Sequence, residues 1–149
     1  VINGVDDEDG CPDEGKSAVQ LTETKLEIAD KIYFDTGKAT IQSKSFNLMQ
    51  QIYSTLRAHP ELTKLRIEGH TDDKGNDAQN LALSQQRADS VKAFLVERGI
   101  DAKRLEAVGF GETRPLSSNK TSRGREMNRR VELVIIEVNG QPRAPAPFQ

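Results

Sequence analysis

The sequence predicts an α+β domain: a two-layer α/β sandwich in which helices pack on one face of a mixed β-sheet. Segments with the alternating pattern of strands and segments with the helical period follow one another in the order strand–helix–strand–helix–strand–strand. Helices that connect strands in this way favour one sheet covered by helices. The length of 149 residues fits one domain of about 100–200 residues with short appendages.

The first half of the folded unit combines a strand and a helix. Residues 26–34 (LEIADKIYF) are rich in β-branched and aromatic residues, which predicts a strand or a short strand pair. Residues 43–60 have the apolar spacing of an amphipathic helix. Its apolar positions are Phe46, Met49, Ile52, Tyr53 and Leu56. The helix should end at His59, because the residue before a proline is pushed out of the helical region.

A second strand and a longer helix follow. Residues 62–70 (LTKLRIEGH) alternate as a strand, with Leu65 and Ile67 on one face. A helix is predicted from about Asp77 to Arg98, and Gly99 is the expected C-terminal stop. The predicted apolar stripe of this helix consists of Leu81, Ala88, Val91 and Leu95.

The last elements are a strand at 104–111 that runs into a glycine turn, a short helix at 121–127 and a strand at 129–138. The final strand, RRVELVIIEV, is apolar on both faces from Val134 onward, which predicts a largely covered strand.

The composition divides the chain into three regions. Residues 1–20 are acidic and predict a loop or linker, residues 21–140 form the folded domain, and residues 141–149 form a proline-rich extended tail. The net charge of −2 argues against general attraction to nucleic acid. No apolar run approaches the roughly 18 residues that span a bilayer.

Polar residues around the second strand and helix predict a binding site. Asn80, Ser84 and Arg87 are spaced four and three residues apart, so they should share one side of the helix and face a cleft. Asp72 follows the preceding strand. A carboxylate and a guanidinium presented together suit a zwitterion, because the first accepts an ammonium and the second binds a carboxylate with two parallel hydrogen bonds. The alternative is that Asp72 and Arg87 pair with each other or lie solvated on the surface.

Catalytic constellations are weak by comparison. Glu68, His70 and Asp72 alternate on one strand face and form only a poor metal-ligand pattern. Cys11 has no evident base, so nucleophilic thiol catalysis is not expected. The GFGE of residues 109–112 lacks the context of a phosphate-binding loop. The basic residues 123–130 have no interleaved aromatic residues, which disfavours nucleic-acid binding. The sequence therefore predicts a binding protein and not an enzyme.

Several motifs in order resemble a known family. EGHTDDKG, NLALSQQRADSVKAFLVERGI, VGFGETRP and NKTSRGREMNRRVELVI are similar to the peptidoglycan-binding domain of the OmpA/MotB/Pal family over about residues 26–138. The resemblance implies that Asp72 and Arg87 hold the diaminopimelate centre of the peptidoglycan stem peptide. It further implies roles in binding for the positions Asn80, Arg129, Asp35, Thr36 and Gly37. Gly37 can offer only backbone groups.

The resemblance also implies a biological setting. The expected function is non-catalytic tethering of an outer-membrane protein to diaminopimelate-type peptidoglycan, at the periplasmic face of a Gram-negative outer membrane. No cofactor is expected for the domain itself. The alternative is a structural or interaction domain of the same fold that serves a motor or secretion assembly without binding this ligand.

Arg129 and Arg130 should point to opposite sides, because successive side chains of a strand alternate. Only one of them is then expected to face the ligand. The resemblance selects Arg129, which leaves Arg130 to pair with an acidic neighbour.

The N-terminal segment INGVDDEDGCPDEG resembles the end of a thrombospondin type 3-like calcium-binding repeat. This resemblance implies a candidate calcium site at Asp6, Asp7 and Asp9, although calcium takes 6–8 oxygen ligands and a solvated acidic linker is the alternative. Cys11 is the single cysteine, so it is either a free thiol or the partner of a cysteine beyond this chain.

Overall fold

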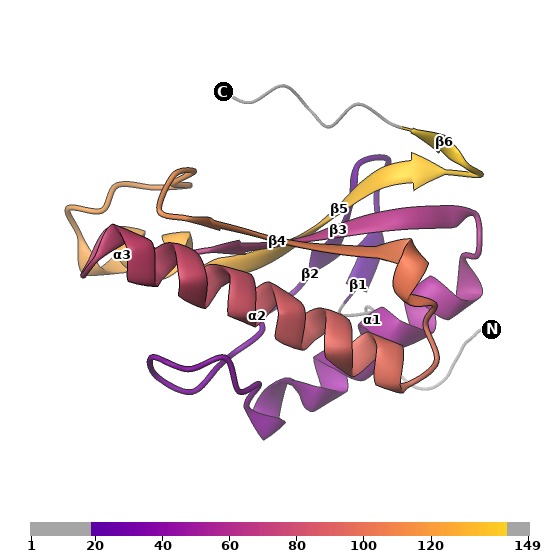
Figure 1. Cartoon of the computed structure of the whole chain (residues 1–149), viewed down its shortest axis with the longest axis horizontal. Helices are drawn as coiled ribbons and strands as arrows, with labels where there is room; N and C mark the ends of the chain where they lie inside the picture. Colours follow the sequence, from indigo (N-terminus) through magenta and orange to yellow (C-terminus); the bar gives the residue numbers. More distant parts are fainter. Residues whose placement is uncertain (1–18, 143–149) are drawn as a thin grey trace.

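The computed structural model describes residues 19–142, and the predicted fold class is confirmed. Six strands form one mixed sheet in the order β1-β2-β5-β3-β4, and β6 pairs with β5. Helices α1 and α2 lie on the same side of this sheet, and α3 lies at one end of it (Figure 1). The elements are β1 (Val19–Leu21), β2 (Lys25–Ile28), α1 (Phe46–Ala58), β3 (Leu62–His70), α2 (Asp77–Glu97), β4 (Leu105–Gly111), α3 (Ser122–Asn128), β5 (Arg130–Val138) and β6 (Gln141–Pro142), with 3-10 turns at Ser43–Ser45 and Ala102–Arg104.

The pairing directions follow from the connections. β3 and β4 are parallel because α2 carries the chain back between them, whereas β5 runs antiparallel to both β3 and β2. The carboxyl ends of β3 and β4 and the start of β5 therefore meet at one end of the sheet. The candidate site lies at this end.

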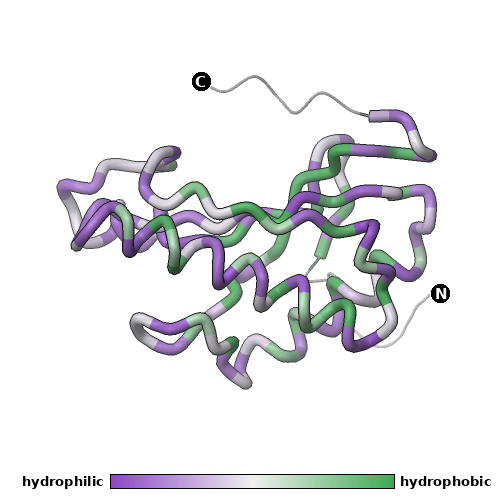
Figure 2. Tube along the Cα trace, viewed as in Figure 1, coloured by the Kyte–Doolittle hydropathy of each residue, from purple (hydrophilic) through white to green (hydrophobic). Residues whose placement is uncertain are grey.

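The core fills the space between the sheet and the two long helices. Its buried side chains come from alternate positions of the strands and from one side of each helix. Figure 2 shows how hydrophobic and hydrophilic residues follow one another along these strands and helices. Its largest fully buried apolar members are Leu26, Met49, Ile52, Leu56, Leu65, Ile67, Val91, Leu95 and Leu133. In β5 Val131, Leu133 and Ile135 are buried, whereas Val134 and Ile136 are half-buried, so the face away from the helices is less covered than the sequence predicted.

The predicted strand at 26–34 was too long. Only Lys25–Ile28 is a strand, and the chain then leaves the sheet until Phe34 forms an isolated bridge with Ile41. Residues 29–33 instead run from the sheet towards the candidate site. Val19 and Gln20 were assigned to the linker and Gln141–Pro142 to the tail, but Val19–Leu21 and Gln141–Pro142 form short strands, which contain too few residues for alternation to be recognised.

The boundaries of the other predicted elements agree with the structure to within three residues, and the largest difference is at the start of α1, where Ser43–Ser45 forms a 3-10 turn. α2 begins after Asn76, whose side chain accepts hydrogen bonds from the Ala78 and Gln79 backbone N–H groups. Arg104 fixes the far end of the fold by donating to the carbonyls of Leu56, His59 and Leu62. No helix within residues 19–142 is long and apolar enough to cross a membrane.

Candidate functional site: a cationic pocket at the end of the sheet

The acidic component of the site is Asp72, two residues after the end of β3. Its side chain is only 9% exposed, and its Oδ2 lies 2.5 Å from Nη1 of Arg129. Its Oδ1 accepts a hydrogen bond of 3.0 Å from the Lys74 backbone N–H. Asp72 thus forms its ion pair with Arg129, and the alternative in which it pairs with Arg87 does not hold in this structure.

Asn80 fixes the loop that carries Asp72. Its Nδ2 donates to the Lys74 carbonyl at 2.8 Å, with a longer contact of 3.4 Å to the Asp72 carbonyl. These bonds connect the first turn of α2 to the loop before it. Asn80 therefore positions the backbone around the carboxylate.

The prediction that Ser84 shares a cleft-facing stripe with Asn80 and Arg87 was wrong. Ser84 is 1% exposed, and its Oγ accepts a hydrogen bond of 2.9 Å from the Gly111 N–H. Leu81, which was assigned to the apolar stripe, is 49% exposed. Both errors have one cause. The helix backbone lies so close to β4 that small residues face the sheet, and a Cβ added to Gly111 would come within 3.2 Å of the Leu81 Cα.

Arg87 holds the segment that follows Phe34. Its Nε donates to the Lys38 carbonyl at 2.8 Å, and its Nη2 lies 3.4 Å from the Asp35 carbonyl. Its guanidinium also lies 4.9 Å from the centre of the Phe34 ring, within the range of a cation–π contact. Burial lowers the pKa of Arg87, and the nearby positive charge of Arg129 lowers this pKa further. The guanidinium is thus partly desolvated, which favours binding of an anion.

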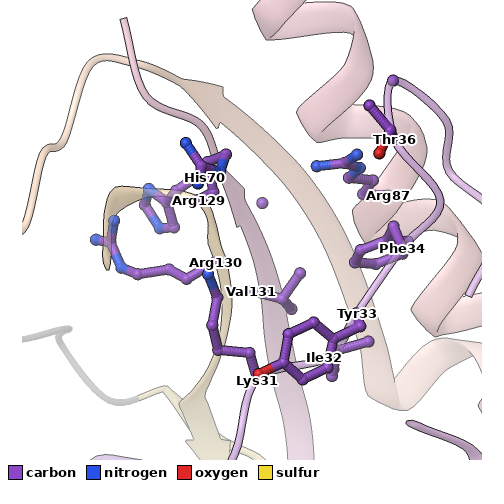
Figure 3. A pocket seen from close by; sticks show the side chains of 12 residues that line it. Lys31, Ile32, Tyr33, Phe34, Thr36, His70, Arg87, Arg129, Arg130 and Val131 are labelled. Atoms are coloured by element: carbon purple, nitrogen blue, oxygen red, sulfur yellow. The ribbon is translucent and has the colours of Figure 1, made fainter. Parts of the chain in front are cut away.

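A pocket of about 210 Å³ lies between these elements. Arg87 and Thr36 are on one side of it, and His70, Arg129 and Arg130 are on the other (Figure 3). The lining residues are Lys31, Ile32, Tyr33, Phe34, Thr36, Gly37, Gly69, His70, Arg87, Arg129, Arg130 and Val131. Four of the predicted site residues, Thr36, Gly37, Arg87 and Arg129, are among them.

Asp72 and Asp35 were also predicted as site residues, and they contact residues that line the pocket. Asp72 contacts it through Arg129, and Asp35 through the carbonyl that faces Arg87. The backbone turns at Asp35, where the Lys38 N–H donates to the Asp35 carbonyl at 2.9 Å, and Gly37 adopts a φ of 68° that favours glycine.

Arg130 pairs with an acidic neighbour, as predicted. Its Nε lies 2.5 Å from Glu132 Oε2, and its other nitrogens donate to the carbonyls of Asn128 and Arg114. The prediction that only one of the two arginines faces the pocket was wrong, because both line it. Arg129 precedes β5 and is the C-cap of α3, so the alternation of a strand does not apply to it.

Sequence reasoning missed Lys31, Tyr33, Phe34 and His70 as pocket residues. The first three were assigned to a strand or strand pair, and the signal against it was the charged Asp30-Lys31 that interrupts the apolar pattern. His70 lies at the end of β3, two residues before the predicted site residue Asp72. Its Nε2 is 3.1 Å from Glu68 Oε1, and its ring stacks on Phe110 at 5.4 Å.

The weak metal pattern of Glu68, His70 and Asp72 is an ion-pair network instead. Glu68 Oε2 accepts a hydrogen bond of 2.9 Å from Arg66, and Asp72 pairs elsewhere. Across residues 19–142 no group of three or more His, Cys, Asp and Glu could hold a metal ion. Cys11 and the candidate calcium ligands Asp6, Asp7 and Asp9 lie outside the described residues, so the calcium site stays a prediction.

The structure is a small α/β domain whose charged residues converge on one end of a mixed sheet. Residues 33–129 match the OmpA family, and the chain belongs to this family. The chain is 36% identical over 130 residues to outer membrane porin F of Pseudomonas aeruginosa. The matched region covers 87% of this chain and 35% of that protein. It spans about half of the length of two further relatives, the probable lipoprotein YiaD of Escherichia coli and outer membrane protein A of Bordetella avium.

Solved structures agree with this assignment. The peptidoglycan-associated lipoprotein of Burkholderia pseudomallei superposes with a TM-score of 0.64 at 34% identity, covering 71% of this chain and 90% of that chain. The cell wall anchor of the type VI secretion system (T6SS) of Pseudomonas aeruginosa gives a TM-score of 0.68 at 27% identity, covering 80% of this chain and 87% of that chain.

Proposed function

We propose that this domain binds peptidoglycan through the diaminopimelate of the stem peptide and tethers an outer-membrane protein to the cell wall. The observation that carries the proposal is the placement of the partly desolvated Arg87 in a pocket next to the Asp72–Arg129 ion pair. The names of two similar structures, a peptidoglycan-associated lipoprotein and a cell wall anchor, support it. The corresponding location is the periplasmic side of the outer membrane.

The ligand chemistry fits this arrangement. The free end of diaminopimelate carries one carboxylate and one ammonium. The Arg87 guanidinium would bind the carboxylate, because a planar fork suits bidentate pairing. The ammonium would bind the Asp72 carboxylate as a third partner. This carboxylate offers about four lone-pair sites and uses two of them for Arg129 and Lys74. Binding needs no nucleophile and no metal, so the domain is a receptor for the wall and not an enzyme.

The test is calorimetric titration with a muropeptide that contains diaminopimelate and with its lysine counterpart. We expect binding of the first and much weaker binding of the second, because lysine lacks the carboxylate that Arg87 would pair with. Arg87→Ala and Asp72→Ala should each lose about 2–5 kcal/mol of binding free energy, partly because one charge is then left unpaired in the complex.

Arg98→Ala is the matched control, since Arg98 is an exposed arginine that follows the same helix and contacts Gln50 and Phe94, away from the pocket. Equal affinity for the two muropeptides, or full binding by both pocket variants, would contradict the assignment. If the folded wild-type protein binds neither muropeptide, the alternative of an interaction domain without this ligand is favoured.

A further inference from the structure

The pocket contains more positive charge than one diaminopimelate centre can neutralise. Its lining includes four cationic side chains, Lys31, Arg87, Arg129 and Arg130, and no aspartate or glutamate. Arg129 and Arg130 are neutralised by Asp72 and Glu132. The other two cations form no ion pair with a carboxylate of residues 19–142.

Arg87 and Lys31 are instead held by backbone carbonyls. Arg87 donates to Lys38 and Asp35, and Lys31 Nζ donates to the Glu126 carbonyl at 2.7 Å. A carbonyl contact orients a cation but does not cancel its charge. Each of these two side chains is therefore available to an anionic partner that residues 19–142 do not supply.

The surroundings of Lys31 are consistent with this. Burial lowers the pKa of the Lys31 ammonium, the charges of Glu126 and Asp30 raise it, and the charges of Arg129 and Arg87 lower it. The two acidic groups lie near but are not ion-paired with it. The Asp30 Oδ1 accepts hydrogen bonds from the Lys31 backbone N–H and the Tyr33 hydroxyl.

Lys31 also stands where the pocket meets a second, more open hollow of about 470 Å³. This hollow exists because the ladder between β2 and β5 ends at Leu26 and Leu133, after which the two strands diverge. Lys31, Arg130 and Val131 line both hollows. A peptide whose side chain fills the first pocket can continue past Lys31 into the second.

We propose that Lys31 binds a second free carboxylate of the stem peptide, separate from the diaminopimelate carboxylate that pairs with Arg87. The proposal rests on the proposed function, since it assigns a further contact to the same ligand. Two groups of the stem have this chemistry: the α-carboxylate of the γ-linked glutamate and the C-terminal carboxylate. The domain would thereby distinguish stem peptides with free carboxylates from amidated ones.

The experiment compares three diaminopimelate-containing tripeptides: the free acid, a form amidated at the glutamate α-carboxylate and a form amidated at the C-terminus. Each is titrated into the wild-type chain, Lys31→Met and Lys31→Arg. Wild-type protein should bind one amidated form about tenfold more weakly than the free acid. Lys31→Met should bind the free acid about tenfold more weakly and show no further loss with that amidated form, whereas Lys31→Arg should retain most of the affinity.

Lys103→Met serves as the control, because Lys103 is exposed and lies outside both hollows. Wild-type affinity of Lys31→Met for the free acid, or equal losses from amidation in the wild type and the variant, would overturn the inference. Either of these outcomes would contradict only the role of Lys31, provided that wild-type protein binds the free acid and Arg87→Ala does not. Absence of binding to any of the three peptides would overturn the proposed function as well.

Discussion

At the scale of single residues, the site is organised by the pairing of Asp72 with Arg129. The carboxylate is nearly buried, whereas the arginine side chain is 44% exposed. Removing the arginine leaves a buried carboxylate with a single backbone donor, so the effect extends beyond ligand binding.

A double-mutant cycle tests this pairing. Arg129→Ala should lower the free energy of unfolding by about 1 kcal/mol in the wild-type background, with a much smaller effect when Asp72 is already alanine. Urea denaturation of the two single variants and the double variant measures the coupling. Strictly additive effects would mean that the pair adds no stability to the free protein.

A second ion-pair network predicts a pH dependence. Burial of Glu68 by itself raises the pKa of its carboxyl, but the hydrogen bond with His70 and the charge and hydrogen bond of Arg66 outweigh burial and lower it. A carboxyl whose pKa is lower in the folded state stabilises the fold above its unfolded pKa of about 4.3. This stabilisation is lost as the pH falls through the lower, folded value.

Glu68→Gln should therefore reduce the free energy of unfolding by about 1–3 kcal/mol at pH 7. The difference from wild type should shrink below about pH 4.3, where the carboxyl of the unfolded wild-type chain takes up a proton, and should vanish below the lower pKa of the folded state. Denaturation at pH 7, 4 and 3 follows the trend, with the exposed Glu106→Gln on β4 as the comparison. A deficit that stays constant over this range would contradict the role of the Glu68 charge.

At the scale of elements, the position of α2 depends on glycines in the strands beneath it. A Cβ added to Gly109 would lie 2.3 Å from the Gln85 backbone nitrogen, and one added to Gly69 would lie 2.2 Å from the Ser84 carbonyl oxygen. These contacts involve helix backbone, which cannot move aside like a flexible side chain. The close approach also brings the Ser84 hydroxyl to the Gly111 N–H.

Gly109→Ala should accordingly destabilise the fold by about 1–3 kcal/mol through overpacking. We expect Glu106→Ala, an exposed change on the same strand, to stay within about 0.5 kcal/mol of wild type. Thermal and urea unfolding measure both variants. A Gly109→Ala protein as stable as wild type would show that α2 can lift from the sheet without loss.

The sequence predicted the helices and strands better than it predicted how closely they pack. The period of residues 77–98 identified α2, on which Asn80 and Arg87 are half-buried and contact Lys74 and Lys38, respectively. Ser84 and Leu81 were exchanged because periodicity cannot tell how closely a helix approaches a sheet. The glycines of GFG at 109–111 contained that information, since glycine within a strand often marks a close backbone approach.

The structure brings the predicted residues Asp72, Arg87 and Arg129 to one end of the sheet, but the sequence did not predict how they pair. Which carboxylate pairs with which guanidinium depends on the relative position of two strand ends 57 residues apart in the chain. Lys31 was missed for a related reason. The chain leaves the sheet after Ile28, and no local pattern reports where it goes.

At the scale of the whole molecule, the sheet has an edge at β4 that a second protein chain could pair with. An exposed strand edge presents unpaired backbone groups and is a common route to association. Here Gln85 of α2 covers it: its Nε2 donates to the Ala107 carbonyl at 2.9 Å, and its Oε1 accepts from the Gly109 N–H at 2.9 Å. The side chain amide thus takes the place of a neighbouring strand.

Replacing this amide should expose the edge. We expect Gln85→Leu to self-associate with increasing protein concentration, because the Ala107 carbonyl and the Gly109 N–H then lack their partner while the strand stays in place. The same change at the neighbouring Gln86, which is exposed, leaves both bonds intact and adds an equal apolar surface. Sedimentation velocity over a range of concentrations compares the two variants with wild type. Association of Gln85→Leu that does not exceed that of Gln86→Leu would mean that the edge is protected by something other than the glutamine amide.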